Sequence, residues 1–433
     1  MRITLLTAGS AGDVRPYAAL GVGLQAAGHR VRLATYPPFE DLVARHGLEF
    51  FAFEGEIGRA TEGTAKRRWQ RSGGRPLPFV TSLVRMVDQA RGVLRRSLDG
   101  AWEACQDSDA VIASAFAFGA PKIAQLLGVP FYWALLQPMT RTRAFPHFLA
   151  PPRLRLGGPY NELTYAVADR VYRRLVRGVL DDWRREMFGL GAVARGDLPL
   201  PGDPSHPVLY GFSPAVVPAP RDWNDAVHVT GFWHLDGESD WRPDPQLAAF
   251  LEAGDPPVWV YVEGDDDEGI GVAQRAVDAL SAAGLRGLLF APWDDLAGVS
   301  LPPTVLRVGF EPLDRLLPHV AAACHHYGVG TSSAALRAGV PSLGRARSFD
   351  QPFWARRLER LGVGLPPLPP RPSVGRLARA FERAAGDPQL RRRAKAFGER
   401  LRAEDGVARA VEAFALHLPA ARRPARRAAG ATA

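Results

Sequence analysis

The chain has 433 residues, more than a single hydrophobic core usually accommodates, so we expect two domains of about 200 residues each. Its 46% hydrophobic and 23% charged residues are typical of a globular protein, and no apolar run approaches the ~20 residues of a membrane span. The formal net charge is +9, but the arginines are scattered over helix faces and a basic tail, which argues against a nucleic-acid or lipid surface.

The start of the chain resembles a strand rather than a targeting signal, which predicts a cytoplasmic protein without an integral membrane segment. Cys105 and Cys324 lie in apolar surroundings without metal-ligand spacing, which indicates core positions.

The first half alternates strand and helix patterns. We expect strands at 3–7, 31–35, 48–53, 110–114 and 130–135, separated by helices at 14–27, 39–46, 80–104 and 117–127. Strands that alternate with helices through short turns predict a doubly wound parallel sheet, whose ligands bind at the carboxyl ends of the strands.

The second half repeats this rhythm after a long helix at 161–189. Strands are expected at 258–262, 287–290, 305–309 and 320–324, with helices at 272–283, 351–361, 374–385 and 388–404. The expected domains are 1–218 and 242–395, joined by a Pro- and Trp-rich linker at 219–241. Residues 396–416 form a helix expected to pack back toward the first domain, and 417–433 form a disordered basic tail.

One stretch, Cys324 to Pro341, has the outline of an anion site. A small apolar strand leads through a turn with two glycines into a short helical pattern at 334–338. Unpaired N–H groups at a helix start suit a phosphate, but this pattern is common in α/β proteins and is weak evidence by itself.

Several ordered motifs make the chain similar to bacterial family 1 glycosyltransferases of the GT-B fold, including sterol-glucosyltransferase-like, macrolide and glycopeptide-antibiotic enzymes. They are the glycine-rich stretch 9–16, the mid-chain stretch 209–214, the histidine–glycine turn 325–331 and the stretch 350–354. This resemblance implies an α/β fold with two Rossmann-like parallel-sheet domains facing across a cleft. It also implies inverting sugar transfer from a nucleotide-diphosphate sugar, with an acceptor in the N-terminal domain and the donor in the C-terminal domain.

For catalysis, the resemblance implies that Asp13 is the general base that takes the acceptor proton. The structural alternative is that Asp13 caps the helix that follows it. Ser10 belongs to the same motif and is expected on the acceptor side.

For the donor, the resemblance implies that His325, Gly328, Gly330 and Thr331 surround the diphosphate. It also implies that Asp350 and Gln351 hold the sugar hydroxyls and that Phe310 stacks near the base. A core histidine, a helix cap and a core aromatic are the respective structural alternatives.

The donor side departs from the family in three places. Acidic residues from Glu263 to Glu268 stand where relatives carry a small turn beside the diphosphate, with Glu263 and Asp265 closest to the strand. Tyr327 replaces a glycine and would strain a left-handed position, with a ring that would occupy phosphate space. Arg345 and Arg347 replace an apolar run and would bind extra negative charge.

Three interpretations of these departures stay open. The first is an active enzyme with a remodelled donor pocket, in which Asp265, Asp266 and Asp267 hold Mg²⁺ against the diphosphate. The second is a catalytically silent homologue that acts as a partner or activator. The third is an enzyme that uses an unusual acidic donor.

The acceptor side is less specific. Phe116, Gln137 and His147 are expected there, and the aromatic residues of the first domain favour a lipophilic natural product. Nucleic acid is not expected as a partner, no cofactor beyond the nucleotide sugar is required, and the sequence does not define an oligomeric state.

Overall fold

The computed structural model describes residues 1–53, 91–151, 154, 156–194, 198–235, 241–262, 266–291, 298–347 and 349–418; the side chains of 266–269 lie outside this description. These residues form two parallel sheets with helices packed on them. None of the described helices is both long and apolar enough to cross a lipid bilayer.

The N-terminal sheet has seven strands among the described residues, in the order β3-β2-β1-β4-β5-β6-β7, and all neighbours pair in parallel. Every residue of β4 and β5 is buried, as expected for strands covered on both faces. The strands are β1 (Arg2–Leu6), β2 (Arg30–Thr35), β3 (Glu49–Ala52), β4 (Ala110–Ala113), β5 (Phe131–Leu135), β6 (Val208–Tyr210) and β7 (Val227–Val229). The helices of this half are α1 (Ala11–Ala26), η1 (Pro37–Phe39), α2 (Glu40–Arg45), α6 (Arg91–Cys105), α7 (Ala120–Leu127) and α8 (Gly158–Phe188).

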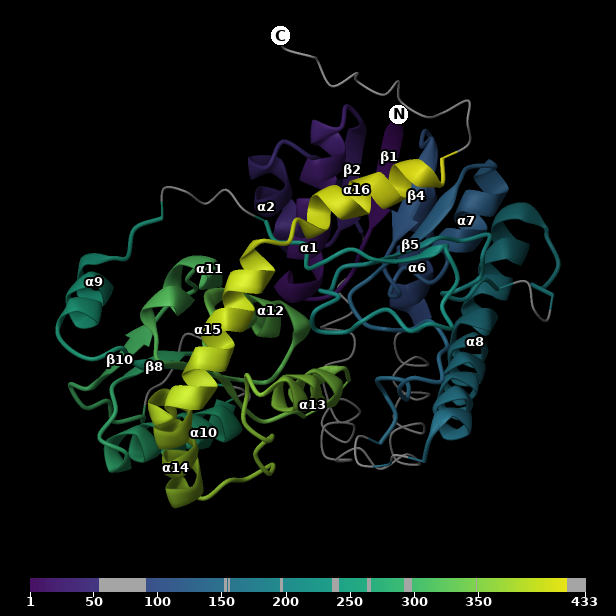
Figure 1. Cartoon of the computed structure of the whole chain (residues 1–433). Coiled ribbons are helices and arrows are strands. Elements are labelled where there is room, and N and C mark those ends of the chain that lie inside the picture. Colours follow the sequence, from purple (N-terminus) through teal and green to yellow (C-terminus); the bar gives the residue numbers. More distant parts are fainter. Residues whose placement is uncertain are drawn as a thin grey trace, which may run out of the picture.

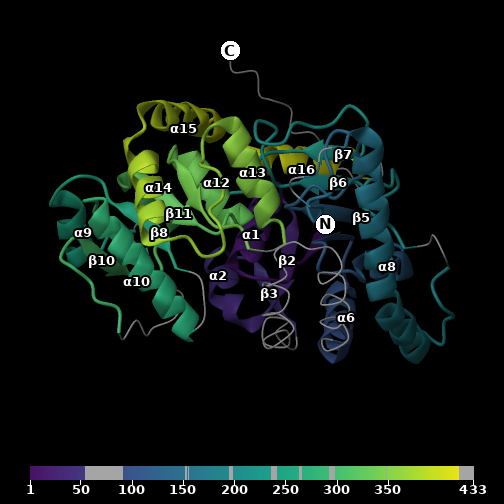
Figure 2. The same cartoon turned by 90° about the horizontal axis from the view of Figure 1, so that it is seen from below.

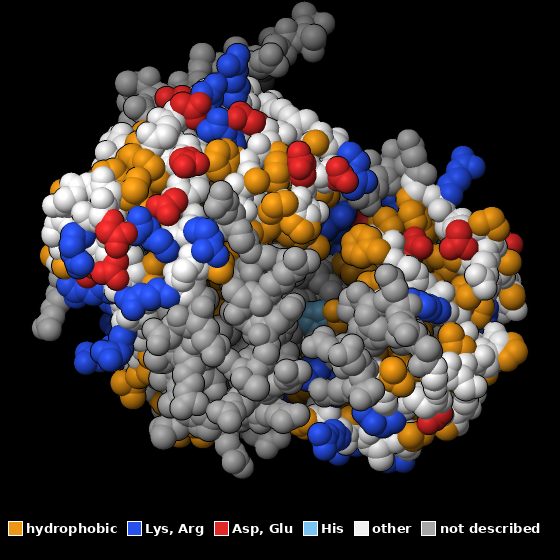
Figure 3. Space-filling view, turned by 180° about the vertical axis from the view of Figure 1, so that it is seen from behind, with side chains coloured by type: hydrophobic (Ala, Val, Ile, Leu, Met, Phe, Trp, Pro, Cys, Tyr) orange, Lys and Arg blue, Asp and Glu red, His pale blue; other side chains and the backbone are white. Residues whose placement is uncertain are grey.

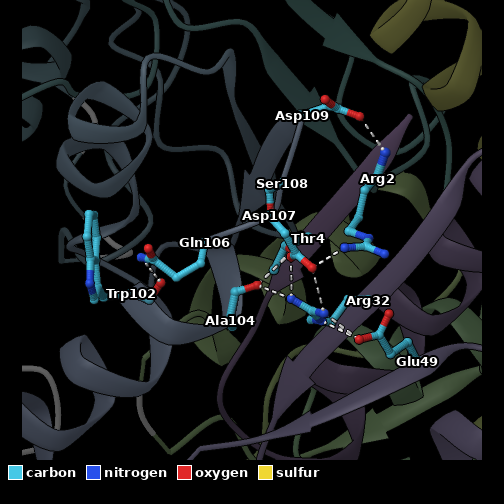
Figure 4. Close-up of polar contacts among 10 residues, drawn as sticks. All are labelled: Arg2, Thr4, Arg32, Glu49, Trp102, Ala104, Gln106, Asp107, Ser108 and Asp109. Carbon is cyan, nitrogen blue, oxygen red and sulfur yellow. Dashed lines mark hydrogen bonds and ion pairs between the residues drawn. The ribbon is translucent and has the colours of Figure 1, made fainter.

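A polar network closes the amino edge of this sheet (Figure 4). Arg32 donates to Glu49 at 2.7 Å and to Asp107 at 2.8 Å, and Arg2 also pairs with Asp107. Burial favours a higher pKa for Asp107, but the Arg32 guanidinium outweighs it and holds that pKa below its usual value. The network lies at the edge opposite the carboxyl ends of the strands. It therefore stabilises the sheet without occupying the edge at which ligands of such sheets bind.

The C-terminal sheet has five strands among the described residues, in the order β10-β9-β8-β11-β12, again all parallel. The strands are β8 (Val258–Tyr261), β9 (Gly287–Phe290), β10 (Val305–Val308), β11 (Ala322–His325) and β12 (Ser342–Gly344). The helices are α9 (Pro245–Glu252), α10 (Asp266–Ala282), α11 (Leu313–Leu316), η2 (Leu317–His319), α12 (Val329–Ala338), α13 (Gln351–Leu361), α14 (Val374–Gly386), α15 (Pro388–Arg402) and α16 (Gly406–Leu416). The change of strand order beside β8 and β11 is where a doubly wound sheet opens a crevice.

The range expected to be a linker, 219–241, is partly sheet. β7 lies inside it and pairs with β6 as the edge strand of the N-terminal sheet. Residues 211–226 before β7 and 230–235 after it have neither helix nor strand.

We expected one helix over 396–416 to pack back on the first domain. In the structure two helices cover this range, and the second of them, α16, makes the contact. α15 extends to Arg402 and packs on α12, whereas α16 lies against α1 and β6 (Figure 1). Ser213 donates to Glu404 at 2.8 Å, just before α16 begins. Most of the predicted tail, 419–433, lies outside the described residues.

The two halves also meet where α1 and α12 begin. Figure 2 shows these helices near the centre of the molecule, and they contact each other. A Cβ atom added at Gly330 would lie 3.2 Å from the Gly12 Cα, so the two backbones approach closely there. The starts of two helices therefore face the same interface.

Candidate functional site

The start of α1 holds the Asp13 carboxylate in a fixed position. Ser10 caps the helix, and its backbone N–H and its hydroxyl both donate to Asp13 Oδ2 at 2.9 Å. The structural alternative for Asp13 was that it caps α1. In the structure Ser10 is the cap, and Asp13 is the third helical residue, which completes the capping box. Gly9 has φ +134°, and a Cβ atom there would lie 2.5 Å from Asp13 Oδ2, so glycine makes room for the carboxylate.

Two carboxylates interact across the domain interface. Burial raises the pKa of Asp13 above its usual 3.8, although the Ser10 hydrogen bonds oppose this rise. Asp350, immediately before α13, is 7% exposed. Burial, together with the charge on Asp13, raises the pKa of Asp350 to about 6, although the Gln137 hydrogen bond opposes this rise. The site therefore holds two acidic groups with raised pKa values.

Asp350 joins the two halves through a hydrogen bond. Gln137, which follows β5, donates from Nε2 to Asp350 Oδ2 at 3.2 Å, and Trp354 Nε1 donates to the same oxygen at 2.9 Å. The predicted acceptor-side residue Gln137 and the predicted sugar-binding residue Asp350 thus lie together. The neighbouring Gln351 accepts from the backbone N–H of Arg347 at 2.8 Å.

The predicted glycine turn is the first turn of α12. Gly328 caps this helix, and Gly330 and Thr331 belong to its first residues, earlier than the helical pattern at 334–338 indicated. The first N–H groups of a helix have no partner within it and carry partial positive charge. This end of α12 lies against the start of α1, so it is suited to an anion between the two halves.

His325 ends β11 directly before this turn and is 3% exposed. Its Nδ1 accepts a hydrogen bond from the Tyr327 N–H at 3.1 Å, so the proton of the neutral ring is on Nε2. Nε2 is buried and has no hydrogen-bond partner among the described residues. Burial lowers the pKa of His325 to about 3, so the ring presents a neutral N–H donor.

Tyr327 has the left-handed backbone that its position predicted, with φ +63°. Its ring is 0% exposed and packs in a core cluster that both halves share, and its hydroxyl donates to the Leu365 carbonyl at 3.2 Å. We expected the ring to occupy phosphate space; instead it fills the core behind the turn. This burial compensates a backbone strain of about 1–2 kcal/mol.

Comparisons with known proteins agree with this architecture. Residues 3–146 match the model of the glycosyltransferase family 28 N-terminal domain, and 293–412 match that of the erythromycin biosynthesis protein CIII-like C-terminal domain. A solved structure, the glycotransferase of kitacinnamycin, aligns with a TM-score of 0.70 over 96% of this chain and 99% of that chain, at 19% identity. The chain has the GT-B fold.

Two further similarities bear on the GT-B chain. A sterol 3-beta-glucosyltransferase of Cryptococcus neoformans var. neoformans is 36% identical over 442 residues, which cover 96% of this chain and 27% of that protein. The chain thus spans about a quarter of that relative's length. A glycosyltransferase of Streptomyces sp. SF2575, solved with thymidine diphosphate, has a TM-score of 0.59 at 20% identity, with 96% of this chain and 99% of that chain covered.

An aromatic cluster crosses the interface of the GT-B domains. Phe116 stacks on Phe349 with ring centroids 5.8 Å apart, and Phe148 meets Phe349 edge-on at 5.3 Å. We did not single out Phe349 from the sequence. Its φ of +56° is rare for a non-glycine residue, and its ring contacts the N-terminal half. The one sequence signal that could have pointed to Phe349 is its position next to Asp350.

Other predicted residues of the GT-B chain lie apart from this centre. Phe310 is 69% exposed and meets Phe290 edge-on at 6.4 Å. His147 is 5% exposed, packs on Tyr165 at 5.1 Å, and has a pKa that burial lowers to about 3. His147 therefore has the surroundings of a core histidine.

A pocket opens beside His325 at the carboxyl ends of β8 and β11, between α10 and α14. Arg345 and Arg275 both line it, and Arg345 also donates to the Pro370 carbonyl. Figure 3 shows one face of the molecule, where basic and acidic side chains are interspersed and a histidine lies inside a recess near the centre.

The predicted acidic loop cannot be placed in the site. Glu263 and Asp265 lie outside the described residues, and of Asp266 and Asp267 only the helical backbone at the start of α10 is described. Within the described part of the chain, no group of three or more His, Cys, Asp or Glu residues is arranged to hold a metal ion. The Mg²⁺ prediction thus stays a prediction.

Proposed function

We propose that the chain is an inverting glycosyltransferase that moves a sugar from a nucleoside diphosphate sugar to a hydroxyl group of a lipophilic acceptor. The observation that carries this proposal is the Asp13 carboxylate, which Ser10 fixes where α1 meets α12 and whose charge acts on Asp350 before α13. The sterol 3-beta-glucosyltransferase relative agrees with both the reaction and the acceptor class.

In this mechanism Asp13 is the general base. Both Ser10 hydrogen bonds use Oδ2, which leaves Oδ1 as the oxygen that takes the acceptor proton. The acceptor oxygen attacks the anomeric carbon from the side opposite the diphosphate, so the bond to the diphosphate breaks with inversion. The raised pKa of Asp13 makes it a stronger base than an exposed aspartate.

The departing diphosphate lies at the start of α12 in this proposal. Partial positive charge at that helix end and the Nε2–H of His325 stabilise the negative charge that develops on the leaving oxygen. A neutral donor serves this purpose at any physiological pH, because the pKa of His325 is near 3.

Asp350 and Gln351 bind the sugar hydroxyls. Gln137 already donates to Asp350, so this amide ties the acceptor half to the group that positions the sugar. Phe116, Phe148 and Phe349 form an apolar wall beside these residues and suit a lipophilic acceptor. We assign the acceptor to the N-terminal half and the donor to the C-terminal half.

Thermal denaturation with UDP, dTDP and their sugars, with and without Mg²⁺, tests the donor site. A nucleotide at about one hundred times its dissociation constant is expected to stabilise the native state by about 2.7 kcal/mol. His325→Ala should remove most of this gain, whereas Leu301→Ala, at an exposed residue, serves as the matched control.

The same experiment separates the alternatives. A Mg²⁺-dependent shift would support a metal bridge at the acidic loop. Stabilisation by no nucleotide at all would contradict the donor site and favour a silent homologue that acts as a partner.

A further inference from the structure

The first half of α8 exposes an apolar stripe to solvent. Leu163 is 59% and Val167 is 51% exposed, and Leu156 and Leu154 in the preceding segment are 67% and 44% exposed. Residues four apart lie on one face of a helix, so Leu163 and Val167 share a face of α8, and Leu154 and Leu156 come shortly before its first turn. Exposed large apolar residues that gather in one place mark an interaction surface.

Arginines extend the same face of the helix. Arg170 and Arg174 follow Val167 at the next positions of the stripe, and both are exposed. Among the described residues from 141 to 174, five arginines outnumber the two acids, Glu162 and Asp169, which leaves a net charge of +3. Glu162 lies 3.9 Å from Arg143, so this acid is offset locally.

We infer that the Leu163–Arg174 stripe of α8, with Leu154 and Leu156 before it, binds the surface of an anionic lipid bilayer. Aliphatic side chains beside arginines on one helix face are typical of a helix that lies in the membrane interface. The apolar residues enter the acyl boundary while the long arginine side chains reach the anionic headgroups. The sequence alone favoured scattered, solvated arginines, but Arg170 and Arg174 lie on the face of α8 that also exposes Leu163 and Val167.

The stripe adjoins the acceptor side of the site. The first turns of α8 hold the loop before it: Asn161 donates to the Arg143 carbonyl at 2.7 Å, and Thr164 accepts from the His147 N–H at 2.9 Å. Phe148, the next residue of that loop, contacts Phe349 beside Asp350. An acceptor dissolved in the bilayer would therefore have a short path to the site. This inference rests on the proposed function and adds that the lipophilic acceptor comes from a membrane.

Vesicle flotation of the full chain tests this inference directly. The protein should float with vesicles of phosphatidylcholine and phosphatidylglycerol, bind less at high salt, and remain unbound with phosphatidylcholine alone. Leu163→Glu with Val167→Glu should weaken binding about ten-fold or more, and Arg170→Glu with Arg174→Glu should abolish the preference for anionic vesicles. Leu301→Glu, at an exposed leucine of the other half, should bind as the parent chain does.

Three results would overturn the inference: no binding to anionic vesicles, equal binding by the α8 variants, or a dimer that the α8 variants dissociate without any vesicle binding. The last result would assign the stripe to a second copy of the chain. Nucleotide-induced thermal stabilisation of the same variants tests the proposed function independently. This stabilisation should persist whether or not a variant binds vesicles, so failure of the membrane inference and failure of the proposed function can be distinguished.

Discussion

Asp350 shows what a buried carboxyl group costs in stability. Its carboxyl group is buried, and its pKa of about 6 lies above the usual 3.8. Between these values the native state keeps a proton that the unfolded chain has released, so the free energy of unfolding falls as the pH rises through this window. At neutral pH the ionised Asp350 is therefore a source of instability that binding of a sugar would offset.

Asp350→Asn should stabilise the protein at neutral pH. The amide oxygen still accepts from Gln137 and Trp354, but no buried charge remains. The expected gain in the free energy of unfolding is up to about 3 kcal/mol at pH 7.5, and it should shrink toward zero near pH 4. Urea unfolding at the two pH values checks this, and an equal gain at both would contradict a raised pKa.

Tyr327 should act through the core rather than through the donor. Tyr327→Phe removes the hydrogen bond to Leu365, so we expect a loss of about 1 kcal/mol of stability with unchanged nucleotide affinity. Tyr327→Gly relieves the left-handed strain but leaves a cavity, with a net loss of about 2 kcal/mol. Thermal denaturation and nucleotide titration measure both. A ten-fold loss of nucleotide affinity in Tyr327→Phe would instead make the hydroxyl a donor contact.

At the scale of elements, α16 fastens the C-terminal end of the chain to the N-terminal half. It begins at Gly406, where Asp405 accepts from the Ala408 N–H at 2.8 Å. Phe414 packs on Tyr132 with ring centroids 4.7 Å apart. A Cβ atom at Gly406 would lie 2.4 Å from the Phe232 carbonyl oxygen, so only glycine lets this helix start against the backbone after β7.

Gly406→Ala should loosen α16, because the contacting atoms belong to the backbone and cannot turn aside. We expect a loss of about 1–3 kcal/mol in the free energy of unfolding. Gly386→Ala is the matched control: that glycine ends α14, and a Cβ atom there meets nothing within 4 Å, so its effect should stay within about 1 kcal/mol. Equal losses in urea unfolding would show that the close approach at Gly406 is unimportant.

At the scale of the whole molecule, periodicity alone predicted two parallel sheets, because buried parallel strands are continuous apolar runs separated by helices. The turn at Gly328 and Gly330 was also predicted as a helix start. The ring direction of Tyr327 was not, because it depends on Leu365, which lies far along the chain. The pairing of β7 with β6 and the left-handed backbone of Phe349 were not predicted, because neither has a local sequence signal.

Ser10, Asp13, Gln137 and Asp350 show the same limit within the site. The capping box at Ser10 and Asp13 follows from local spacing, but the contact between Gln137 and Asp350 joins two domains and appears only when the halves are placed together. The family resemblance indicated each residue separately. Their meeting across one interface is what supports a shared reaction centre.

The most direct measurement for the proposed transferase is the single-turnover rate of Asp13→Asn with a nucleotide sugar and a sterol acceptor. Asparagine keeps an oxygen for the Ser10 N–H but is not a base, so the rate should fall about 10²- to 10⁴-fold while nucleotide affinity stays unchanged. Ser10→Ala, which keeps the backbone donor, should lose much less. An unchanged rate in a folded Asp13→Asn protein would contradict the assignment of Asp13 as the base.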